Sequence, residues 1–177
     1  MQETSSAEAI PARKRVADML TASRLVIALA VITVGLLFGR EAAGIVLMLI
    51  LIGWTTDVAD GQLARSLETP VQSRIGDNDL AVDLVLDLAG YIYFIACGFL
   101  APVWSLGYLL AACIIVSFVR TRRIILILEM PLLIITPIIA FTQLNWVSII
   151  YVAWLLGILV YNWSRMISII GFMWGRD

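Results

Sequence analysis

The sequence contains no histidine and only two cysteines among its 177 residues. The absence of histidine removes the commonest general base and the commonest ligand for transition metals. Cys97 and Cys113 lie inside apolar runs, where we expect small apolar packing residues rather than a disulfide or a metal site. Acid–base and metal chemistry in this chain would therefore depend on carboxylates.

Charge is also scarce, since only 14% of the residues are charged and 62% are hydrophobic. No soluble domain of this size is so apolar. Apolar runs of about 15 to 20 residues recur, which is close to the length that a helix needs to cross a bilayer. The composition therefore predicts an all-α integral membrane protein with six transmembrane helices in one bundle. We expect these spans at about residues 25–38, 42–56, 80–100, 104–119, 124–141 and 146–166.

Lysine and arginine gather on one side of the six predicted spans. These charges resist translocation, so their asymmetry sets the orientation of the chain. Only Arg40 falls on the other side, and the pattern therefore predicts that both termini are cytoplasmic. The residues on the cytoplasmic side are Arg13, Lys14, Arg15, Arg24, Arg65, Arg74, Arg120, Arg122, Arg123, Arg165 and Arg176.

The N-terminal residues 1–23 are predicted to form a cytoplasmic segment with a short amphipathic helix. From Val16 onward, apolar residues recur at helical spacing among basic ones, which suits a helix on the membrane surface. The alternative is that this segment is the start of the first span. Residues 24–170 would then form the transmembrane domain, and residues 171–177 a cytoplasmic tail.

Seven of the 13 acidic residues lie between Asp57 and Asp87. Asp57 and Asp60 stand three residues apart near the end of the second predicted span. Asp79, Asp83 and Asp87 stand four apart at the start of the third. Each set therefore shares one helix face. Carboxylates at membrane depth cost several kcal/mol unless they are paired, hydrated or bound to a cation.

The two acidic sets should meet in an oxygen-lined pocket, because the two helices are joined at their cytoplasmic ends. Arg65 and Arg74 are the only bases that we expect nearby. Mg²⁺ and Mn²⁺ bind carboxylate oxygens and bridge them to phosphate, so we expect one or two such ions. Gly61 and Ala64 leave the adjacent helix face almost bare, and Arg65 could bind phosphate oxygens. The alternative is a solvated charged loop at the end of the bundle.

Three motifs carry a resemblance to a known family. The run DVADGQLAR, residues 57–65, matches every defined position of the pattern D-x2-D-G-x2-A-R. The run GDNDLAVD is close to G-x3-D-x3-D, although only two residues separate Gly76 from Asp79. Near the N-terminus, ADMLTASR looks like an N-x-L-T-x-x-R segment. With these motifs the chain resembles the CDP-alcohol phosphotransferases, whose six-span fold with cytoplasmic termini matches the expectation above.

The position of Gly76 leaves two registers for the second half of the signature. In the first, Asp79 and Asp83 are the last motif pair, and Asp87 is the further aspartate that family members often carry four residues later. In the second, Asp83 and Asp87 are the pair, but six residues then separate Gly76 from Asp83. We prefer the first register.

The resemblance implies transfer of a phosphoalcohol group, such as phosphatidyl, from a CDP-alcohol to an acceptor hydroxyl. CMP would be released, usually in phospholipid biosynthesis, and six-span relatives tend to be homodimers. By matched position, Asp83 is implied as the general base, and in the absence of histidine an aspartate is the obvious proton acceptor. The implied metal ligands are Asp57, Asp60, Asp79 and Asp83, and the implied nucleotide and phosphate site is Gly61, Ala64 and Arg65.

Two features outside the signature have open roles. Arg120, Arg122 and Arg123 lie on the predicted cytoplasmic side, where they could contact the phosphate of an acidic acceptor or simply anchor the topology. Glu129 lies inside a predicted span, where a charge normally faces protein or a water-filled cavity. It could line the route of the acceptor or pair with a polar neighbour.

The expected partners are a CDP-alcohol donor, an alcohol acceptor and membrane lipids, with at least one substrate a lipid and no nucleic acid. The expected location is a bacterial inner membrane with the active site facing the cytoplasm. Two alternatives remain: a non-enzyme, namely a catalytically inactive relative that binds CDP ligands, and a different enzyme, an Asp-rich membrane transferase acting on prenyl diphosphate. A divalent-cation transporter is disfavoured, because its acids would lie near the bilayer midplane.

Overall fold

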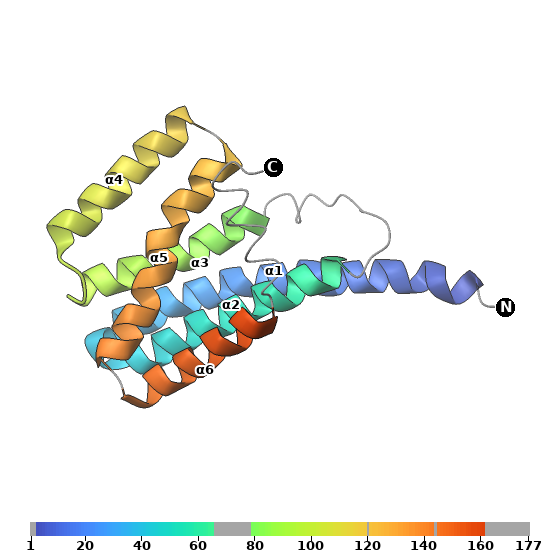
Figure 1. Ribbon diagram of the computed structural model, residues 1–177, viewed down its shortest axis with the longest axis horizontal. Helices are drawn as coiled ribbons and strands as arrows, with labels where there is room; N and C mark the ends of the chain where they lie inside the picture. The colour runs from blue at the N-terminus through green and yellow to red at the C-terminus, as the bar shows by residue number, and fades with distance from the viewer. Residues whose placement is uncertain (1–2, 66–78, 120, 144, 162–177) are drawn as a thin grey trace. The chain divides into compact units, whose positions relative to one another are not determined.

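The computed structural model describes residues 3–65, 79–119, 121–143 and 145–161. Within these ranges, the side chains at 3–18, 60–65, 79–80, 122, 143 and 145 lie outside the description. The described chain is helical and contains no strand (Figure 1), which confirms the prediction of an all-α protein. In chain order the elements are α1 (Glu3–Phe38), the 3-10 helix η1 (Gly39–Ala42), α2 (Ala43–Arg65), α3 (Asp79–Ala96), α4 (Pro102–Phe118), α5 (Arg122–Gln143) and α6 (Asn145–Tyr161).

Helix α1 differs from the expectation of a separate short amphipathic helix. It is continuous over Glu3–Phe38, so residues 3–23 and the first predicted span belong to one helix. The physical reason is local: no glycine or proline stands between Pro11 and Gly35, so nothing in this stretch interrupts the backbone hydrogen bonds of the helix. A cytoplasmic location for residues 1–23 stays a prediction.

Two helical stretches are long and apolar enough to cross a membrane, namely Met19–Ala59 and Arg123–Thr142. The first contains η1 and so covers parts of two helices. The apolar helices Pro102–Phe118 and Trp146–Tyr161 are shorter. Many large apolar side chains are exposed on these helices, as expected where lipid rather than water surrounds them. Six crossings, the orientation and a single six-helix bundle stay predictions.

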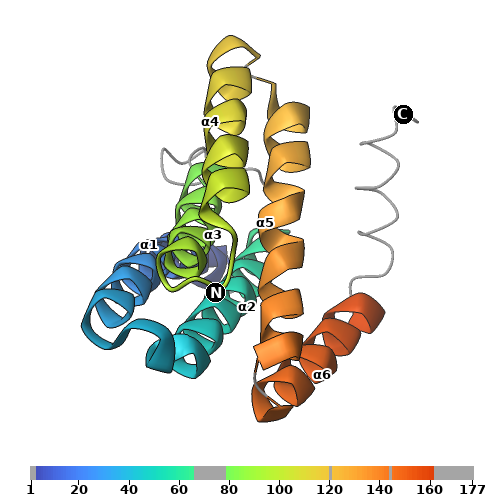
Figure 2. The same cartoon turned by 90° about the vertical axis from the view of Figure 1, so that its left-hand side faces the viewer.

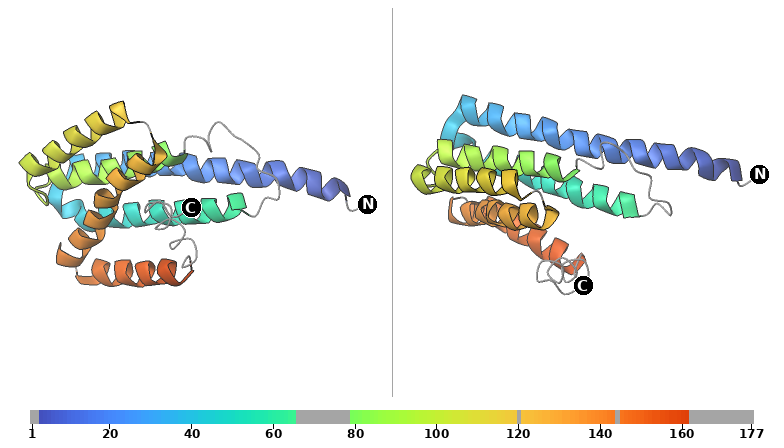
Figure 3. Two further views of the ribbon diagram at one scale, coloured as in Figure 1. Left: turned by 45° about the horizontal axis from the view of Figure 1, so that its top comes forward. Right: turned by 90° about the horizontal axis from the view of Figure 1, so that it is seen from above.

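The described residues divide into two compact units, with the boundary between Tyr93 and Phe94. In the first unit, α1 and α2 run side by side in opposite directions (Figure 3). Gly39 has a φ of 55° at their junction, a conformation that glycine adopts without steric cost. The core between these helices is apolar and includes Ala28, Val31, Val46, Leu47 and Ile50.

Helix α3 approaches both of these helices at glycines. A Cβ atom on Gly35 of α1 would collide with the Tyr93 ring, and one on Gly53 of α2 would collide with Leu86. The Tyr93 hydroxyl also donates a hydrogen bond to the Gly39 carbonyl oxygen, 2.9 Å away. Small residues allow helices of membrane proteins to pack closely in this way. These contacts determine which face of α3 lies against α1 and α2.

The second unit begins with the end of α3. Gly98, with a φ of 73°, follows the last helical turn, and the Phe99 N–H donates to the Phe94 carbonyl oxygen at 2.9 Å. The Phe94 and Phe99 rings meet edge to face. This is a Schellman ending, in which a left-handed glycine and an apolar contact satisfy the last helical carbonyls.

Hydrogen bonds from side chains to backbone connect the remaining helices of the second unit. Helices α4 and α5 lie side by side (Figure 2), and the Tyr108 hydroxyl of α4 donates to the Leu128 carbonyl oxygen of α5. The Ser148 hydroxyl of α6 donates to the Ala140 carbonyl oxygen of α5 at 2.7 Å. The Tyr108 hydroxyl is partly buried and the Ser148 hydroxyl is buried. Hydroxyls shielded from water need such partners, so these bonds help to set the packing of α5 against its neighbours.

Candidate functional site

Arg24 joins the three helices of the first unit at one polar site. Its side chain is fully buried on α1. The Nη1 atom donates to Oδ1 of Asp57 on α2 at 3.1 Å, and the same nitrogen donates to Oδ1 of Asp83 on α3. Two aspartates, one from each half of the acidic signature, therefore share one guanidinium nitrogen.

The buried face of α1 explains why Arg24 reaches this site. Thr21, Arg24, Ala28 and Val31 are all buried and follow one another at intervals of three or four residues, so they share one face of the helix. The Arg24 Nη2 atom donates to the Thr21 hydroxyl oxygen at 3.2 Å. The guanidinium is therefore oriented from its own helix as well as by its two carboxylate partners.

Exposure differs sharply across the ion pairs. The Arg24 side chain is 0% exposed, whereas those of Asp57 and Asp83 are 39% and 25% exposed. A buried guanidinium needs charged partners, because an unpaired buried charge is very costly. One guanidinium balances only one of two carboxylates, so this trio retains negative charge on its more open side. The arrangement suits a cation that approaches from that side.

Asp87 lies one helical turn from Asp83 and has a different environment. It is only 7% exposed, and its Oδ1 accepts a hydrogen bond from the Trp54 indole N–H at 2.8 Å. Trp54 precedes Asp57 by three residues, and Asp87 follows Asp83 by four. The antiparallel helices α2 and α3 are thus aligned with Asp57 beside Asp83 and Trp54 beside Asp87.

A family model described as CDP-alcohol phosphatidyltransferase matches residues 14–174. The chain belongs to this family. No curated protein and no solved structure matches it. Membership makes the protein a transferase of phosphate-containing groups in a membrane-associated family, and the apolar helices agree with that setting.

The CDP-alcohol phosphatidyltransferase signature is only partly described by the structure. Asp57 and Asp83 are brought together through Arg24. Residues 60–65, which include four predicted site residues, form the last turns of α2, and Asp79 begins α3. The side chains of these residues lie outside the described part of the structure. Arg74 and Gly76 lie outside it entirely. Among the described side chains, no group of three metal-binding residues occurs.

The remaining predicted residues belong to the second unit. Arg120 lies outside the described residues, and the same holds for the side chain of Arg122. Arg123 is half-buried near the start of α5. Glu129 is buried on α5 at 6% exposure, as expected for a charge inside an apolar span. Their predicted roles toward substrate stay predictions.

The expectation that Arg65 and Arg74 are the only bases near the acidic pocket is wrong. Arg24, which the sequence indicated only as a topology charge, forms ion pairs with both described acids. A signal for it was present, because both Thr21 and Arg24 belong to the segment that resembles N-x-L-T-x-x-R. Their spacing with Ala28 and Val31 also places them on the buried face of α1.

The described residues fit a divalent ion at this site. Oxygen atoms of Asp57 and Asp83 meet from two helices at a point that already holds one positive group. Carboxylate oxygens are the ligands that Mg²⁺ and Mn²⁺ prefer. Both contacts with Arg24 use Oδ1, and so they do not engage Oδ2 of either carboxylate. Those second oxygens can serve an ion.

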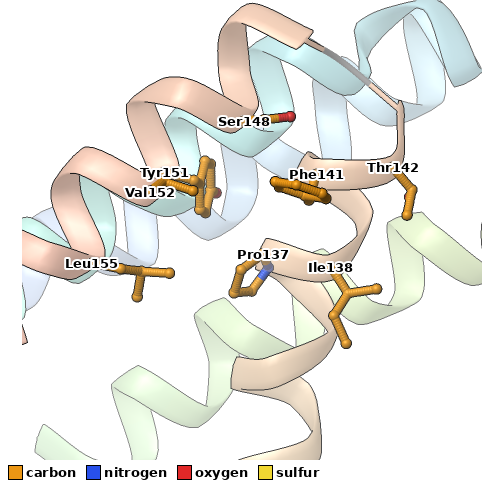
Figure 4. Close-up of a pocket in the computed structure, with 8 residues that line it drawn as sticks. All are labelled: Pro137, Ile138, Phe141, Thr142, Ser148, Tyr151, Val152 and Leu155. Carbon is orange, nitrogen blue, oxygen red and sulfur yellow. The ribbon is translucent and has the colours of Figure 1, made fainter.

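A separate cavity of about 280 Å³ lies between α5 and α6 (Figure 4). Apolar side chains dominate its lining, and no carboxylate, amine or guanidinium takes part. Such a lining offers room for an apolar group but no means of binding a diphosphate. The residues that line it are Pro137, Ile138, Phe141, Thr142, Ser148, Tyr151, Val152 and Leu155.

Proposed function

We propose that the protein transfers a phosphoalcohol group, such as phosphatidyl, from a CDP-alcohol to an acceptor hydroxyl and releases CMP. The observation that carries this proposal is the meeting of Asp57 and Asp83 at Arg24. These aspartates come from the two halves of the signature, and residues 14–174 match the family. Phospholipid biosynthesis is the setting that we infer, with at least one of the two substrates a lipid.

The proposed metal site consists of Asp57, Asp60, Asp79 and Asp83. One or two Mg²⁺ or Mn²⁺ ions would supply neutralisation of the diphosphate charge, which phosphoryl transfer requires. The alignment of α2 with α3 supports this set of ligands. Trp54 lies beside Asp87, and Asp57 lies beside Asp83. Continued by one step in the same direction, this alignment leads to Asp60 on α2 and to the start of α3. Gly61, Ala64 and Arg65 would line the nucleotide and phosphate site.

Asp83 is the general base in this proposal. Its carboxylate would accept the proton of the acceptor hydroxyl while that oxygen attacks the phosphorus atom bearing the alcohol group. The bond from this phosphorus to CMP would break, and CMP would leave. Partial exposure of Asp83, at 25%, supports the role, since a base must reach its substrate. Asp87 is less suited, because it is buried and bonded to Trp54.

The membrane arrangement that we propose has six spans with both termini in the cytoplasm. The active site would face the cytoplasm across a bacterial inner membrane, and two copies would form a homodimer. Arg120, Arg122 and Arg123 would lie on the same side and could contact the phosphate of an acidic acceptor. Support comes from where the described helices lie along the sequence and from the distribution of the arginines.

Release of CMP tests the proposed function. Purified protein would be incubated with a panel of CDP-alcohols and acceptor alcohols in the presence of Mg²⁺ or Mn²⁺. We expect CMP from at least one pair, with none after chelation of the metal or in Asp57→Asn. Metal binding without CMP from any pair would instead indicate an inactive relative. Release of inorganic diphosphate from a prenyl diphosphate would indicate the other transferase class.

A further inference from the structure

We infer that Arg24 is a positioning residue for the metal-binding carboxylates, an inference that rests on the proposed function. In this role the arginine does not touch substrate or the reacting atoms. It holds Oδ1 of Asp57 and of Asp83 through one nitrogen, and it leaves the second oxygen of each carboxylate for the ion. Residues that bind a metal-ligating carboxylate on the side away from the ion orient that ligand before the ion binds.

The guanidinium is held firmly enough for such a role. Its Nη2 atom donates to the Thr21 hydroxyl oxygen one helical turn earlier, and the whole side chain is buried. A planar guanidinium held on two sides cannot follow a moving partner as a flexible ammonium group can. Movement of Asp57 or Asp83 away from the shared nitrogen would break an ion pair, so the two helices are kept at a defined separation.

The exposure of the three side chains indicates that Arg24 supports the ion rather than replaces it. Arg24 lies on the closed side of the site, while Asp57 and Asp83 are partly open. If the arginine occupied the position of the ion, it would have to leave a fully buried position each time an ion bound. With the arginine behind them, the carboxylates keep their net negative charge toward the open side, and the ion adds to the arrangement without displacing it.

The role of Arg24 can be tested by Mn²⁺ binding, measured from the electron paramagnetic resonance signal of free Mn²⁺ with full-length protein in nanodiscs. We expect Arg24→Gln to weaken Mn²⁺ binding by about 10- to 100-fold, the usual effect of losing an outer partner of a metal ligand. Arg24→Lys should recover part of this loss, because lysine retains the positive charge but lacks the rigid, planar set of N–H donors of the guanidinium. Arg40→Gln, the same change at an exposed arginine of η1, is the matched control and should bind as the wild type does.

Thr21→Val tests the same role with the guanidinium in place. This change removes only the hydroxyl that orients Arg24, so we expect weaker Mn²⁺ binding than in the wild type and a smaller loss than in Arg24→Gln. Its control is Thr33→Val, since the exposed Thr33 hydroxyl bonds only within α1, to the Leu29 carbonyl oxygen. Should Arg24→Gln fail to fold, Thr21→Val alone decides the question.

The possible outcomes separate this inference from the proposed function. Unchanged Mn²⁺ affinity in Thr21→Val, or tighter binding in Arg24→Gln, would overturn the positioning role while the wild type still bound metal and released CMP. Tighter binding would mean that the arginine competes with the ion. A wild-type protein that bound no Mn²⁺ would overturn the proposed metal dependence, and the positioning role with it.

Discussion

The indole N–H of Trp54 donates a hydrogen bond to Oδ1 of Asp87 across the interface between α2 and α3, at 2.8 Å. This bond distinguishes Asp87 from Asp83, although both are aspartates on one face of one helix. Asp83 binds Arg24 and is partly exposed, whereas Asp87 is buried. The two acids therefore have different environments, and the register in which Asp79 and Asp83 form the last motif pair stays a prediction.

The bond between Trp54 and Asp87 leads to a first prediction. Asp87→Asn retains a side-chain carbonyl that can accept from the indole, so it should keep more stability than Asp87→Ala. The alanine variant leaves the indole N–H without this acceptor and should lose about 1–3 kcal/mol. Thermal unfolding in nanodiscs measures both, with Trp104→Phe as a control because Trp104 is exposed. Loss of Mn²⁺ binding in Asp87→Asn would instead favour Asp83 and Asp87 as the motif pair.

A second prediction concerns the division of roles between the two acids that bind Arg24. Asp83→Asn should lower turnover by about 10²- to 10⁴-fold, the usual contribution of a general base, with a smaller effect on CDP binding. Turnover is measured as CMP release, and CDP binding by calorimetry. Glu41→Gln, at an exposed acid of η1, should change neither quantity. Normal turnover in Asp83→Asn would remove the assignment of Asp83 as the base.

The close approach of α1 and α3 leads to a third prediction. Gly35→Ala places a Cβ atom against the Tyr93 ring, which is buried and bonded to Gly39. We expect a loss of about 1–3 kcal/mol, typical of overpacking in a core. Gly107→Ala is the control, because a Cβ atom there meets nothing within 4 Å. Equal unfolding temperatures for the two variants would show that α3 can move away from α1 at little cost.

The proposed orientation gives a fourth prediction, which concerns single cysteines labelled from outside intact cells. In a variant without Cys97 and Cys113, a cysteine at Arg40 should react with a membrane-impermeant maleimide. A cysteine at position 5 or 175 should react only after the cells are opened, because both termini are expected in the cytoplasm. Labelling of either terminal position in intact cells would contradict the six-span topology.

Several elements of the fold were predictable because their signals are local. Apolar runs indicated the α-helices of the described residues, and proline at the start of α4 and Gly98 after α3 stand where helices commonly begin and end. The sequence left open whether residues 1–23 form a short surface helix or the start of a longer one, since amphipathic spacing describes a helix face but does not end a helix; α1 is continuous over Glu3–Phe38. The end of a helix needs its own signal, and this stretch has none.

Spacing in the sequence was enough to place Asp57 and Asp60 on one face and Asp79, Asp83 and Asp87 on another, because helix geometry alone dictates it. The partners of these acids could not be predicted in this way. Arg24 stands 33 residues from Asp57 and 59 residues from Asp83, and no periodicity within α1 indicates which residues of other helices meet its buried face. That choice depends on how α3 packs against Gly35 and Gly53, where side-chain volume sets the separation and alignment of the helices. The helix faces that carry the acids could therefore be predicted from the sequence, whereas the arginine that pairs with Asp57 and Asp83 and the separate environment of Asp87 were decided by tertiary packing.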